Sequence, residues 1–323
     1  MEYFQKKEIN TRRSLKYTYY VSPSGRSTKQ CPALLFVHGF PDSAHLWKDV
    51  IREIGDKVSG QIIIPDCLGY AGTDKPTDTG LYSFHGQADD MVDILKCENV
   101  QSAVLIGHDW GSVLAQRIYL HHRALFSAVI LLNTGYMVPS DQFFDLATVN
   151  EVTTKAFGYP QFSYWDFFTA SDAAEIIDAR LERMWQVLHG DVEDWMKKLF
   201  CVPNAMREFL VSSRKEVPLK PYAQKAEWRD AFLAQFRRDG FSTSLEMYKA
   251  TVTNVQAQSD SRLLSESLVI DVPLLFIICS RDAVCLPQLM DTAKQQGLVP
   301  KLKEVVLDAA HWSPMEKPAE IAS

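Results

Sequence analysis

Short apolar runs recur along the chain and are separated by longer segments of mixed polarity. Each run is continuously apolar and lacks the alternation of a strand that has one face in water. Continuous apolar strands are typical of a parallel sheet covered by helices on both faces, and the stretch 112–121 has the character of such a helix. Six strands are predicted, at residues 33–37, 61–64, 103–106, 127–132, 274–278 and 303–307.

The middle of the chain has a different pattern. Between residues 138 and 248 the strand signal disappears, and segments such as 172–188 and 191–199 space their apolar residues as helices do. This stretch is also rich in Trp, Phe, Tyr and Met. We therefore predict a core domain formed by residues 1–137 and 249–323, interrupted by a helical lid at residues 138–248.

Composition narrows the classes of function. The 323 residues are 46% hydrophobic and 23% charged, with a formal net charge of -6 and no block of basic residues. Phosphate binding needs clustered Lys and Arg, so nucleic acid is not an expected partner. The polar first ten residues are unlike a secretory signal, and no apolar run approaches the roughly 20 residues of a membrane span.

The six cysteines lie far apart and form no C-x-x-C pair. This spacing argues against a zinc ribbon or a thioredoxin-like centre, and no metal site is predicted. Free cysteines in apolar runs fit a reducing compartment. We expect a monomer or homodimer in the cytoplasm, with the peroxisome as the alternative location.

The sequence GHDWGS at residues 107–112 stands between a predicted strand and a predicted helix. This context, with small flanking residues, is that of a nucleophile elbow, and the reactive position holds Asp109. An isolated Asp in such a turn could simply cap the helix, but the glycines and the motifs below favour a reactive role. A carboxylate can displace a leaving group from saturated carbon, forming an ester that water then cleaves. Esterase and lipase activities, which need Ser there, are not expected.

Further motifs follow other predicted strands. HGFP at residues 38–41 can present the backbone N–H of Phe40, and the N–H of Trp110 is the expected second donor of an oxyanion hole. Asp282 and His311 also follow strands, where open α/β sheets place their sites. In this order along the chain, Asp282 would orient His311, and His311 would take a proton from water.

Four motifs together resemble the soluble epoxide hydrolases of the α/β-hydrolase fold, most closely the fungal and plant forms that lack an extra N-terminal domain. The resemblance runs over nearly the whole chain. It implies a mostly parallel central sheet flanked by helices, an inserted helical lid, and hydrolysis of epoxides to vicinal diols without a metal or organic cofactor. The motifs are HGFPDS at 38–43, GHDWGS at 107–112, SRD at 280–282 and AHWSPMEKPAE at 310–320.

The resemblance also implies two lid tyrosines that hold the epoxide oxygen. FSYW at 162–165 and SLEMYK at 244–249 match their surroundings, which assigns the roles to Tyr164 and Tyr248, with Tyr159 as the alternative first tyrosine. A phenol suits this chemistry, because opening an epoxide creates an alkoxide that needs a proton.

The expected ligands are a small apolar epoxide and water. Phe40, Trp110, Trp312 and the aromatic residues of the lid are expected to form a mostly apolar pocket. TASD at residues 169–172 replaces the acidic-proline-glycine signature that often follows the first lid tyrosine in the family. This departure leaves the shape of the lid and the substrate range open.

Two other functions remain open. A haloalkane or haloacetate dehalogenase would share Asp109 and His311, but the paired tyrosines argue against it, and a haloacetate enzyme would need Arg in place of Trp110. A ligand-binding receptor on this fold would bind without turnover, and the complete set of catalytic residue types argues against that. Chloride release would identify the first, and saturable binding without product the second.

Overall fold

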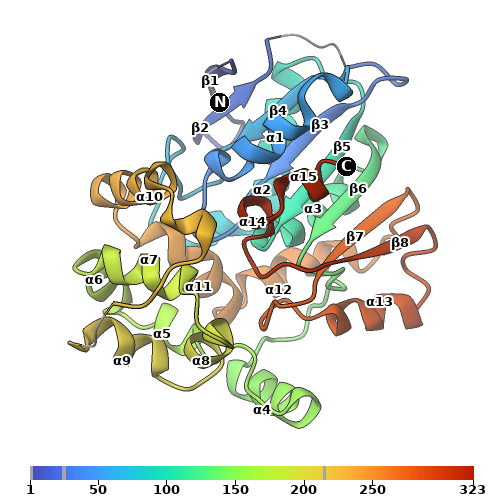
Figure 1. The fold of residues 1–323 in the computed structure, drawn as a ribbon. Helices are drawn as coiled ribbons and strands as arrows, with labels where there is room; N and C mark the ends of the chain where they lie inside the picture. Colours follow the sequence, from blue (N-terminus) through green and yellow to red (C-terminus); the bar gives the residue numbers. More distant parts are fainter. Residues whose placement is uncertain (1–2, 24–26, 214–215) are drawn as a thin grey trace. The chain divides into compact units, whose positions relative to one another are not determined.

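The computed structural model describes residues 3–23, 27–213 and 216–323, and the chain divides into two compact units. The first unit is Met1–Asp141 together with Gln256–Ser323, and the second is Gln142–Val255. The first contains a sheet and helices, whereas the described residues of the second form helices and no named strand (Figure 1). No helix in the described ranges is long and apolar enough to cross a membrane.

The first unit is built on an eight-stranded sheet with the strand order β1-β2-β4-β3-β5-β6-β7-β8. The strands from β4 to β8 in this order are parallel, and only β1 and β2 run antiparallel to their neighbours. The predicted mostly parallel sheet is therefore confirmed. The strands are β1 Gln5–Asn10, β2 Lys16–Val21, β3 Ala33–Val37, β4 Ile62–Pro65, β5 Ala103–His108, β6 Phe126–Leu132, β7 Leu274–Cys279 and β8 Leu302–Leu307.

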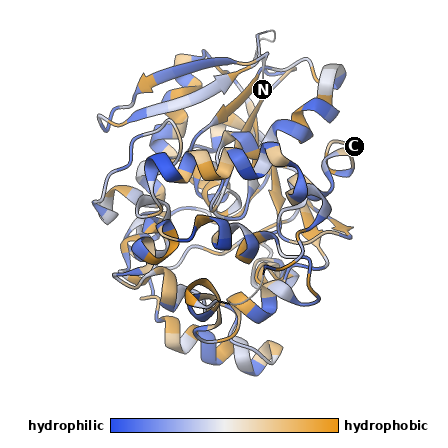
Figure 2. Cartoon of the chain, turned by 60° about the vertical axis from the view of Figure 1, so that its left-hand side comes forward, coloured by the Kyte–Doolittle hydropathy of each residue, from blue (hydrophilic) through white to orange (hydrophobic). Residues whose placement is uncertain are grey.

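The apolar pattern does not predict the hairpin β1–β2. Strand β1 reads QKKEIN, and its side chains are exposed or half-buried, so it lacks the continuous apolar run of the inner strands. Figure 2 shows the contrast between the hydrophilic outer hairpin and the hydrophobic inner strands. Charged residues on an edge strand discourage pairing with another chain.

Helices cover both faces of this sheet. Helix α2 packs on α3, and α1 packs on α14 and α15, and Figure 1 shows these two groups on opposite faces of the sheet. Each face of the sheet therefore carries helices, as expected for strands with continuously apolar sequences. The helices of this unit are α1 Lys48–Ile54, α2 Phe84–Cys97, α3 Trp110–His121, α12 Val255–Asp260, which starts at the unit boundary, α13 Asp291–Gln295, α14 Ser313–Glu316 and α15 Pro318–Ile321.

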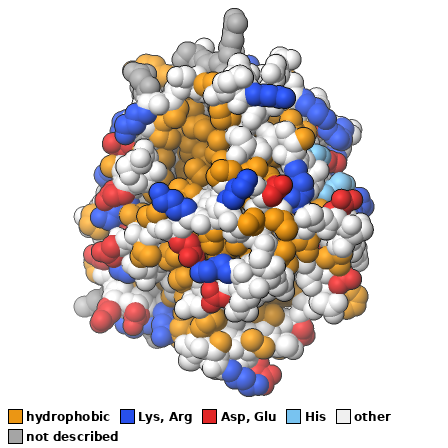
Figure 3. Space-filling view, turned by 90° about the vertical axis from the view of Figure 1, so that its right-hand side faces the viewer, with side chains coloured by type: hydrophobic (Ala, Val, Ile, Leu, Met, Phe, Trp, Pro, Cys, Tyr) orange, Lys and Arg blue, Asp and Glu red, His pale blue; other side chains and the backbone are white. Residues whose placement is uncertain are grey.

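One face of the sheet keeps apolar surface in contact with solvent. Leu34, Val104, Ile130 and Leu275 are partly exposed, although they lie on central strands. The register of the strands puts them on the same face. Leu34 pairs with Val104, Val104 pairs with Ala128, which lies two residues before Ile130, and Ile130 pairs with Leu275. Figure 3 shows apolar side chains gathered in a hollow on one face of the molecule.

The second unit owes its helices to apolar residues at helical spacing. Helix α7 buries Leu181, Met184, Trp185 and Leu188, which recur at the i, i+3, i+4 and i+7 positions of one helix face. The helices of this unit are α4 Leu146–Phe157, α5 Trp165–Phe168, α6 Ala173–Asp178, α7 Leu181–His189, α8 Trp195–Phe200, α9 Ala205–Val211, α10 Ala226–Asp239 and α11 Glu246–Val252.

Two helix predictions in this unit need correction. The predicted helix 172–188 is two helices, because Arg180 leaves the helical region with φ -143° and ψ 38°. The predicted helix 191–199 begins only at Trp195, because Asp194 takes a left-handed conformation with φ 54°. No Gly or Pro marks either break, so the local sequence gives no sign of it.

A buried ion pair in the first unit fixes the two segments that border the insertion. The guanidinium of Arg117 on α3 donates to both carboxylate oxygens of Asp260 at 2.8 and 2.7 Å, and both side chains are buried. Arg117 also donates to the carbonyl of Met137 at 2.6 Å, and the N–H of Ser140 donates to Asp260 at 3.3 Å. The Arg117–Asp260 pair thus connects the segment before the insertion, at Met137 and Ser140, with helix α12 after it.

We predict that Asp260→Asn lowers the free energy of unfolding by about 3–5 kcal/mol, because it leaves the Arg117 charge buried and uncompensated. Chemical denaturation measures the change. The matched control is Arg229→Met, which removes a half-exposed pair with Glu182 and should change stability by under about 1 kcal/mol. Equal effects of the two variants would contradict the role given to the buried pair.

Candidate active site

The turn between β5 and α3 holds Asp109 in a conformation that few residues adopt. Its φ is 55° and its ψ is -125°, which is costly for a residue with a Cβ atom. Two glycines make the turn sterically possible. A Cβ on Gly107 would lie 2.3 Å from the carbonyl oxygen of Gly111, and a Cβ on Gly111 would lie 2.2 Å from the carbonyl oxygen of Val37. The turn has the geometry of the predicted nucleophile elbow.

The carboxylate of Asp109 is bound by backbone donors from two loops. The N–H of Phe40 donates to Oδ1 at 2.8 Å, and the N–H of Trp110 also hydrogen-bonds this side chain. These are the two groups predicted to form an oxyanion hole. Burial raises the pKa of Asp109, whereas the charge of His311 and these two N–H groups favour the carboxylate. The elbow thus carries a desolvated carboxylate with directed hydrogen bonds.

The loop that presents Phe40 is fixed by a neutral histidine. The Nδ1 of His38 donates to the carbonyl of Gly39 at 2.9 Å, and its Nε2 accepts the N–H of Cys67 at 2.9 Å. Burial lowers the pKa of His38 to about 4, so the ring is uncharged at neutral pH. A Cβ on Gly39 would lie 2.4 Å from Oδ1 of Asp109, which explains why the loop needs glycine there.

The segment after β4 supports this loop. The carboxylate of Asp66 accepts the N–H of Ala44 at 2.9 Å and the N–H of Gly72 at 3.1 Å. Its hydrogen bonds therefore join the segment after β3 to the segment after β4. We find no contact of Asp66 with the carboxylate of Asp109 among the described residues.

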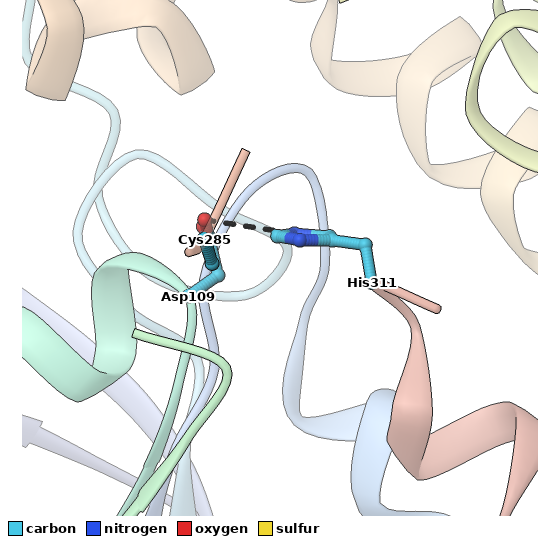
Figure 4. A group of neighbouring side chains, drawn as sticks. All are labelled: Asp109, Cys285 and His311. Carbon is cyan, nitrogen blue, oxygen red and sulfur yellow. Dashed lines mark ion pairs between the residues drawn. The ribbon is translucent and has the colours of Figure 1, made fainter. Parts of the chain in front are cut away.

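His311 lies between two carboxylates. Its Nδ1 donates to Oδ2 of Asp282 at 2.7 Å, and its Nε2 lies 3.6 Å from Oδ2 of Asp109. Figure 4 shows the imidazole pointing at the Asp109 carboxylate. The nucleophile candidate, the histidine and the acid, which are predicted from separate motifs, are thus brought together in the geometry of a triad.

Asp282 is fully satisfied by its neighbours. Its Oδ1 accepts the backbone N–H groups of Val284 and Cys285 at 2.9 Å each, and its Oδ2 accepts the side-chain amide of Asn133 at 2.7 Å as well as His311. Each carboxylate oxygen of Asp282 therefore accepts two hydrogen bonds, and these four donors favour the ionised form, which only accepts. Asp282 therefore stays charged and holds the imidazole in one orientation.

The charges shift each other's pKa in opposite directions. Burial opposes charge on His311, but the two carboxylates, Asp282 above all, raise its pKa to about 9. Burial also opposes ionisation of Asp282, yet the charge of His311 and the hydrogen bonds hold its pKa far below its usual range. At neutral pH His311 is thus an imidazolium ion when Asp109 is a free carboxylate.

Sequence reasoning misses three polar residues around this triad. Asn133 follows β6 and has a φ of 67°. Its side-chain amide N–H donates to Asp282, and its Oδ1 accepts the hydroxyl of Ser313 at 3.0 Å. His108 holds the backbone of His311 by donating to its carbonyl at 2.8 Å. Burial lowers the pKa of His108 to about 3, so this ring stays neutral. The only available signal is position, because Asn133 and His108 stand at the ends of strands.

Asp42 is a half-buried acid that sequence reasoning leaves without a role. Burial, with a contribution from the negative charge of Asp109, raises its pKa to about 8, while the charge of His311 opposes this shift. Asp42 is therefore mostly protonated at neutral pH. Its position directly after HGFP is the signal that could have drawn attention to it.

The predicted lid tyrosines meet within the second unit. The ring centroids of Tyr164 and Tyr248 are 5.9 Å apart at an interplanar angle of 78°, and both side chains are buried. Phe168 contacts both rings, at 5.3 and 5.0 Å. The alternative residue Tyr159 is half-buried and lies under the ammonium group of Lys197 at 4.4 Å. The aromatic cluster therefore favours Tyr164 over Tyr159 as the partner of Tyr248.

The three wall residues predicted in the first unit all contact the triad, Trp312 through its ring and Phe40 and Trp110 through their backbone N–H groups. Trp312 is buried, and its ring lies 4.8 Å from the ring of His311. Trp110 is half-buried, and its ring lies 6.5 Å from that of Phe84. Phe40 is buried and contributes its backbone N–H to Asp109.

Comparison with known proteins agrees with this geometry. A family model described as alpha/beta hydrolase fold matches residues 32–318. Epoxide hydrolase A of Mycobacterium tuberculosis is 28% identical over 307 residues, which cover 90% of this chain and 88% of that protein. Bifunctional epoxide hydrolase 2 of Rattus norvegicus is 25% identical over 292 residues, with 90% of this chain covered. The chain spans 50% of the length of that rat protein.

Solved structures show the same fold. Epoxide hydrolase A from Mycobacterium thermoresistibile superposes with a TM-score of 0.76 and 22% identity, over 99% of this chain and 96% of that one. An epoxide hydrolase from an endophytic Streptomyces gives a TM-score of 0.78 and 23% identity, over 100% of this chain and 94% of that one. The predicted fold class, with a mostly parallel sheet and an inserted helical unit, is confirmed.

We predict that Asp282→Asn lowers the pKa of His311 from about 9 by about 1–3 units, because it removes the nearest opposite charge. A titration of labelled histidine side chains by NMR measures the pKa. The raised pKa of His311 also stabilises the folded protein. This stabilisation is complete below pH 6.5, the ordinary pKa of histidine, and is lost as the pH rises through about 9. The unfolding free energy of the wild type should therefore fall across this range more steeply than that of the variant. An unchanged pKa would contradict the assignment of Asp282 as its main cause.

Proposed function

The chain belongs to the alpha/beta hydrolase fold family, and on that premise we propose that it hydrolyses epoxides to vicinal diols through an ester on Asp109. The observation that carries the proposal is the carboxylate at the elbow. Its Oδ1 is bound by backbone N–H and its Oδ2 faces the Nε2 of His311 at 3.6 Å. A carboxylate in this position suits attack on saturated carbon, and an epoxide supplies such a carbon with a strained leaving group.

The first step forms the ester. Oδ2 of Asp109 attacks a ring carbon, and the bond from that carbon to the epoxide oxygen breaks. The oxygen leaves as an alkoxide, which takes a proton from the hydroxyl of Tyr164 or Tyr248. The pairing of these two rings at 5.9 Å supports a shared role, because two phenols can hold one oxygen atom.

The second step cleaves the ester. Once Asp109 is esterified it carries no charge, so one of the carboxylates that raise the pKa of His311 is lost. The imidazolium then releases its proton more readily. This proton restores the tyrosine hydroxyl that gave its proton to the alkoxide, and the free Nε2 takes a proton from water. The water oxygen attacks the ester carbonyl carbon, and the N–H groups of Phe40 and Trp110 stabilise the oxyanion. The bond between the carbonyl carbon and Oδ2 then breaks, and Oδ2 takes a proton and leaves in the diol. The oxygen from water stays in the carboxylate of Asp109.

The expected substrate is small and apolar, and no metal or organic cofactor takes part in these steps. Aromatic side chains from both units support this, with Trp312 against His311 in the first and Phe168 against both tyrosines in the second. We also propose that the second unit acts as the lid of the site, in keeping with the role predicted for residues 138–248.

A dehalogenase is the second candidate, and Trp110 is the observation that favours it. An indole directly after the nucleophile can donate its ring N–H to a halide. Halide departure needs no proton, so this activity would not depend on the tyrosines. Chloride release from a haloalkane, unchanged by Tyr248→Phe, would support this candidate over the epoxide hydrolase.

We predict that His311→Gln blocks the second step and leaves the first. Incubation with an excess of styrene oxide should then give a stable protein adduct whose mass exceeds that of the free protein by the mass of one epoxide. The adduct should be located at Asp109 by peptide mass spectrometry. Asp109→Ala is the matched control and should give neither adduct nor diol, and diol formation by this control would refute the proposed nucleophile.

We predict that Tyr248→Phe lowers the rate of ester formation by about 10²–10⁴-fold, because it removes a proton donor to the leaving oxygen. Stopped-flow fluorescence or quench measurements with styrene oxide give this rate. Tyr222→Phe is the matched control, since Tyr222 is a buried tyrosine of the same unit that contacts His189 instead. Similar losses in both variants would point to a general effect on the unit and not to catalysis.

A further inference from the structure

We propose that Asp109, Cys285 and His311 form an inhibitory site for a zinc ion. One ligand atom of each residue lies within 4.8 Å of the ligand atoms of the other two. Figure 4 shows the three side chains converging from separate segments of the first unit. The proposal concerns regulation of the site described above, and its effect on turnover rests on the proposed function.

The three ligand types suit zinc. Zinc binds carboxylate oxygen, imidazole nitrogen and thiolate sulfur at about 2.0–2.3 Å, most often in a tetrahedral arrangement. In such an arrangement the ligand atoms are about 3.3–3.8 Å apart, so closure from 4.8 Å needs a movement of about 1–1.5 Å. Mg²⁺ and Ca²⁺ prefer oxygen ligands only, and we expect them to bind this site poorly.

His311 is already oriented as a metal ligand. Its Nδ1 donates to Asp282 at 2.7 Å, which leaves Nε2 directed at Asp109. A carboxylate that holds the far nitrogen of a histidine ligand is the usual outer partner in zinc sites, where it fixes the ring and raises its basicity. The contact that prepares the histidine for catalysis therefore also prepares it for zinc.

The same acid positions Cys285. Its backbone N–H donates to Oδ1 of Asp282 at 2.9 Å, and its sulfur accepts the hydroxyl of Thr134 at 3.2 Å. These contacts hold the thiol beside the triad, although it has no part in either step of the proposed reaction. Zinc binding would displace to solvent both the thiol proton of Cys285 and the Nε2 proton of His311, which leaves the sulfur as thiolate and the imidazole neutral.

Bound zinc would stop both steps of the reaction. It would take the lone pair of Oδ2 of Asp109, which attacks the epoxide, and the lone pair of Nε2 of His311, which takes the proton of water. Its fourth coordination position would be left to water. The inhibition should be reversible, because a chelator can remove the ion without breaking a covalent bond.

The first test measures diol formation from styrene oxide at increasing Zn²⁺ concentration. Cys285→Ser should raise the concentration that halves the rate by at least about tenfold, because one of three protein ligands is lost. Cys97→Ala, which removes an exposed thiol, should leave that concentration unchanged. Mg²⁺ added in place of Zn²⁺ should leave the rate of diol formation unchanged. Cys285→Val, which fills the space of the thiol without a ligand atom, provides a second variant if the serine variant is poorly folded.

The second test does not depend on catalysis. Co²⁺ replaces Zn²⁺ in such sites, and a thiolate ligand gives a sulfur-to-cobalt charge-transfer band in the near ultraviolet. We expect this band in the wild type and in Cys97→Ala, and its loss in Cys285→Ser. The half-buried histidines His85 and His121, whose rings are 4.7 Å apart, could bind cobalt but cannot produce the band.

The two tests separate the proposals. A cobalt band that requires Cys285 supports the metal site even if the protein does not hydrolyse epoxides. Zinc inhibition of equal strength in the wild type, Cys285→Ser and Cys285→Val would overturn the site. So would a cobalt spectrum without a charge-transfer band, or one that persists in both Cys285 variants.

Discussion

The site depends on one imidazolium ion held between two carboxylates, the buried one of Asp282 and the half-buried one of Asp109. His311 lies 2.7 Å from Asp282 and 3.6 Å from Asp109, and the three residues follow β8, β7 and β5 respectively. Desolvation makes each charge costly alone, and the opposite charge beside it offsets part of that cost. The parallel register of the sheet provides this, because it brings the ends of these strands to one edge. The same charges set the pKa of the histidine, so esterification of Asp109 changes its basicity at the moment when a base is needed.

Much of the fold and the centre of the site could be predicted from the sequence. Strands buried on both faces are continuously apolar, and β3 to β7 were found for that reason. Strand β8 was also predicted, but it reads LKEVVL and its side chains are mostly exposed. Asp109, Asp282 and His311 are recognisable because each stands just after such a strand, and because GHDWGS contains the glycines that a tight turn needs. The local sequence therefore carries the information for groups whose position is set by a strand end and a turn.

The remaining features depend on contacts between distant segments. Asn133 reaches Asp282 because β6 lies next to β7 in the sheet. The order of the strands in the sheet cannot be derived from the local sequence. Cys285 lies at the triad because its backbone binds Asp282, whereas its spacing from other cysteines suggests only a buried thiol. The polar strand β1 is held by pairing with β2 and carries no apolar signal. The break at Arg180 likewise has no helix-breaking residue that would mark it in the sequence.

The central claim is that Asp109 forms a covalent bond to the substrate, and a single turnover in ¹⁸O-labelled water tests it most directly. With enzyme in excess over styrene oxide, the account predicts a first diol without label, because its new oxygen comes from Asp109. The label should then appear in the carboxylate of Asp109, detected by mass spectrometry of its peptide. A labelled first diol with an unlabelled Asp109 would mean that water attacks the epoxide directly, which would contradict the account.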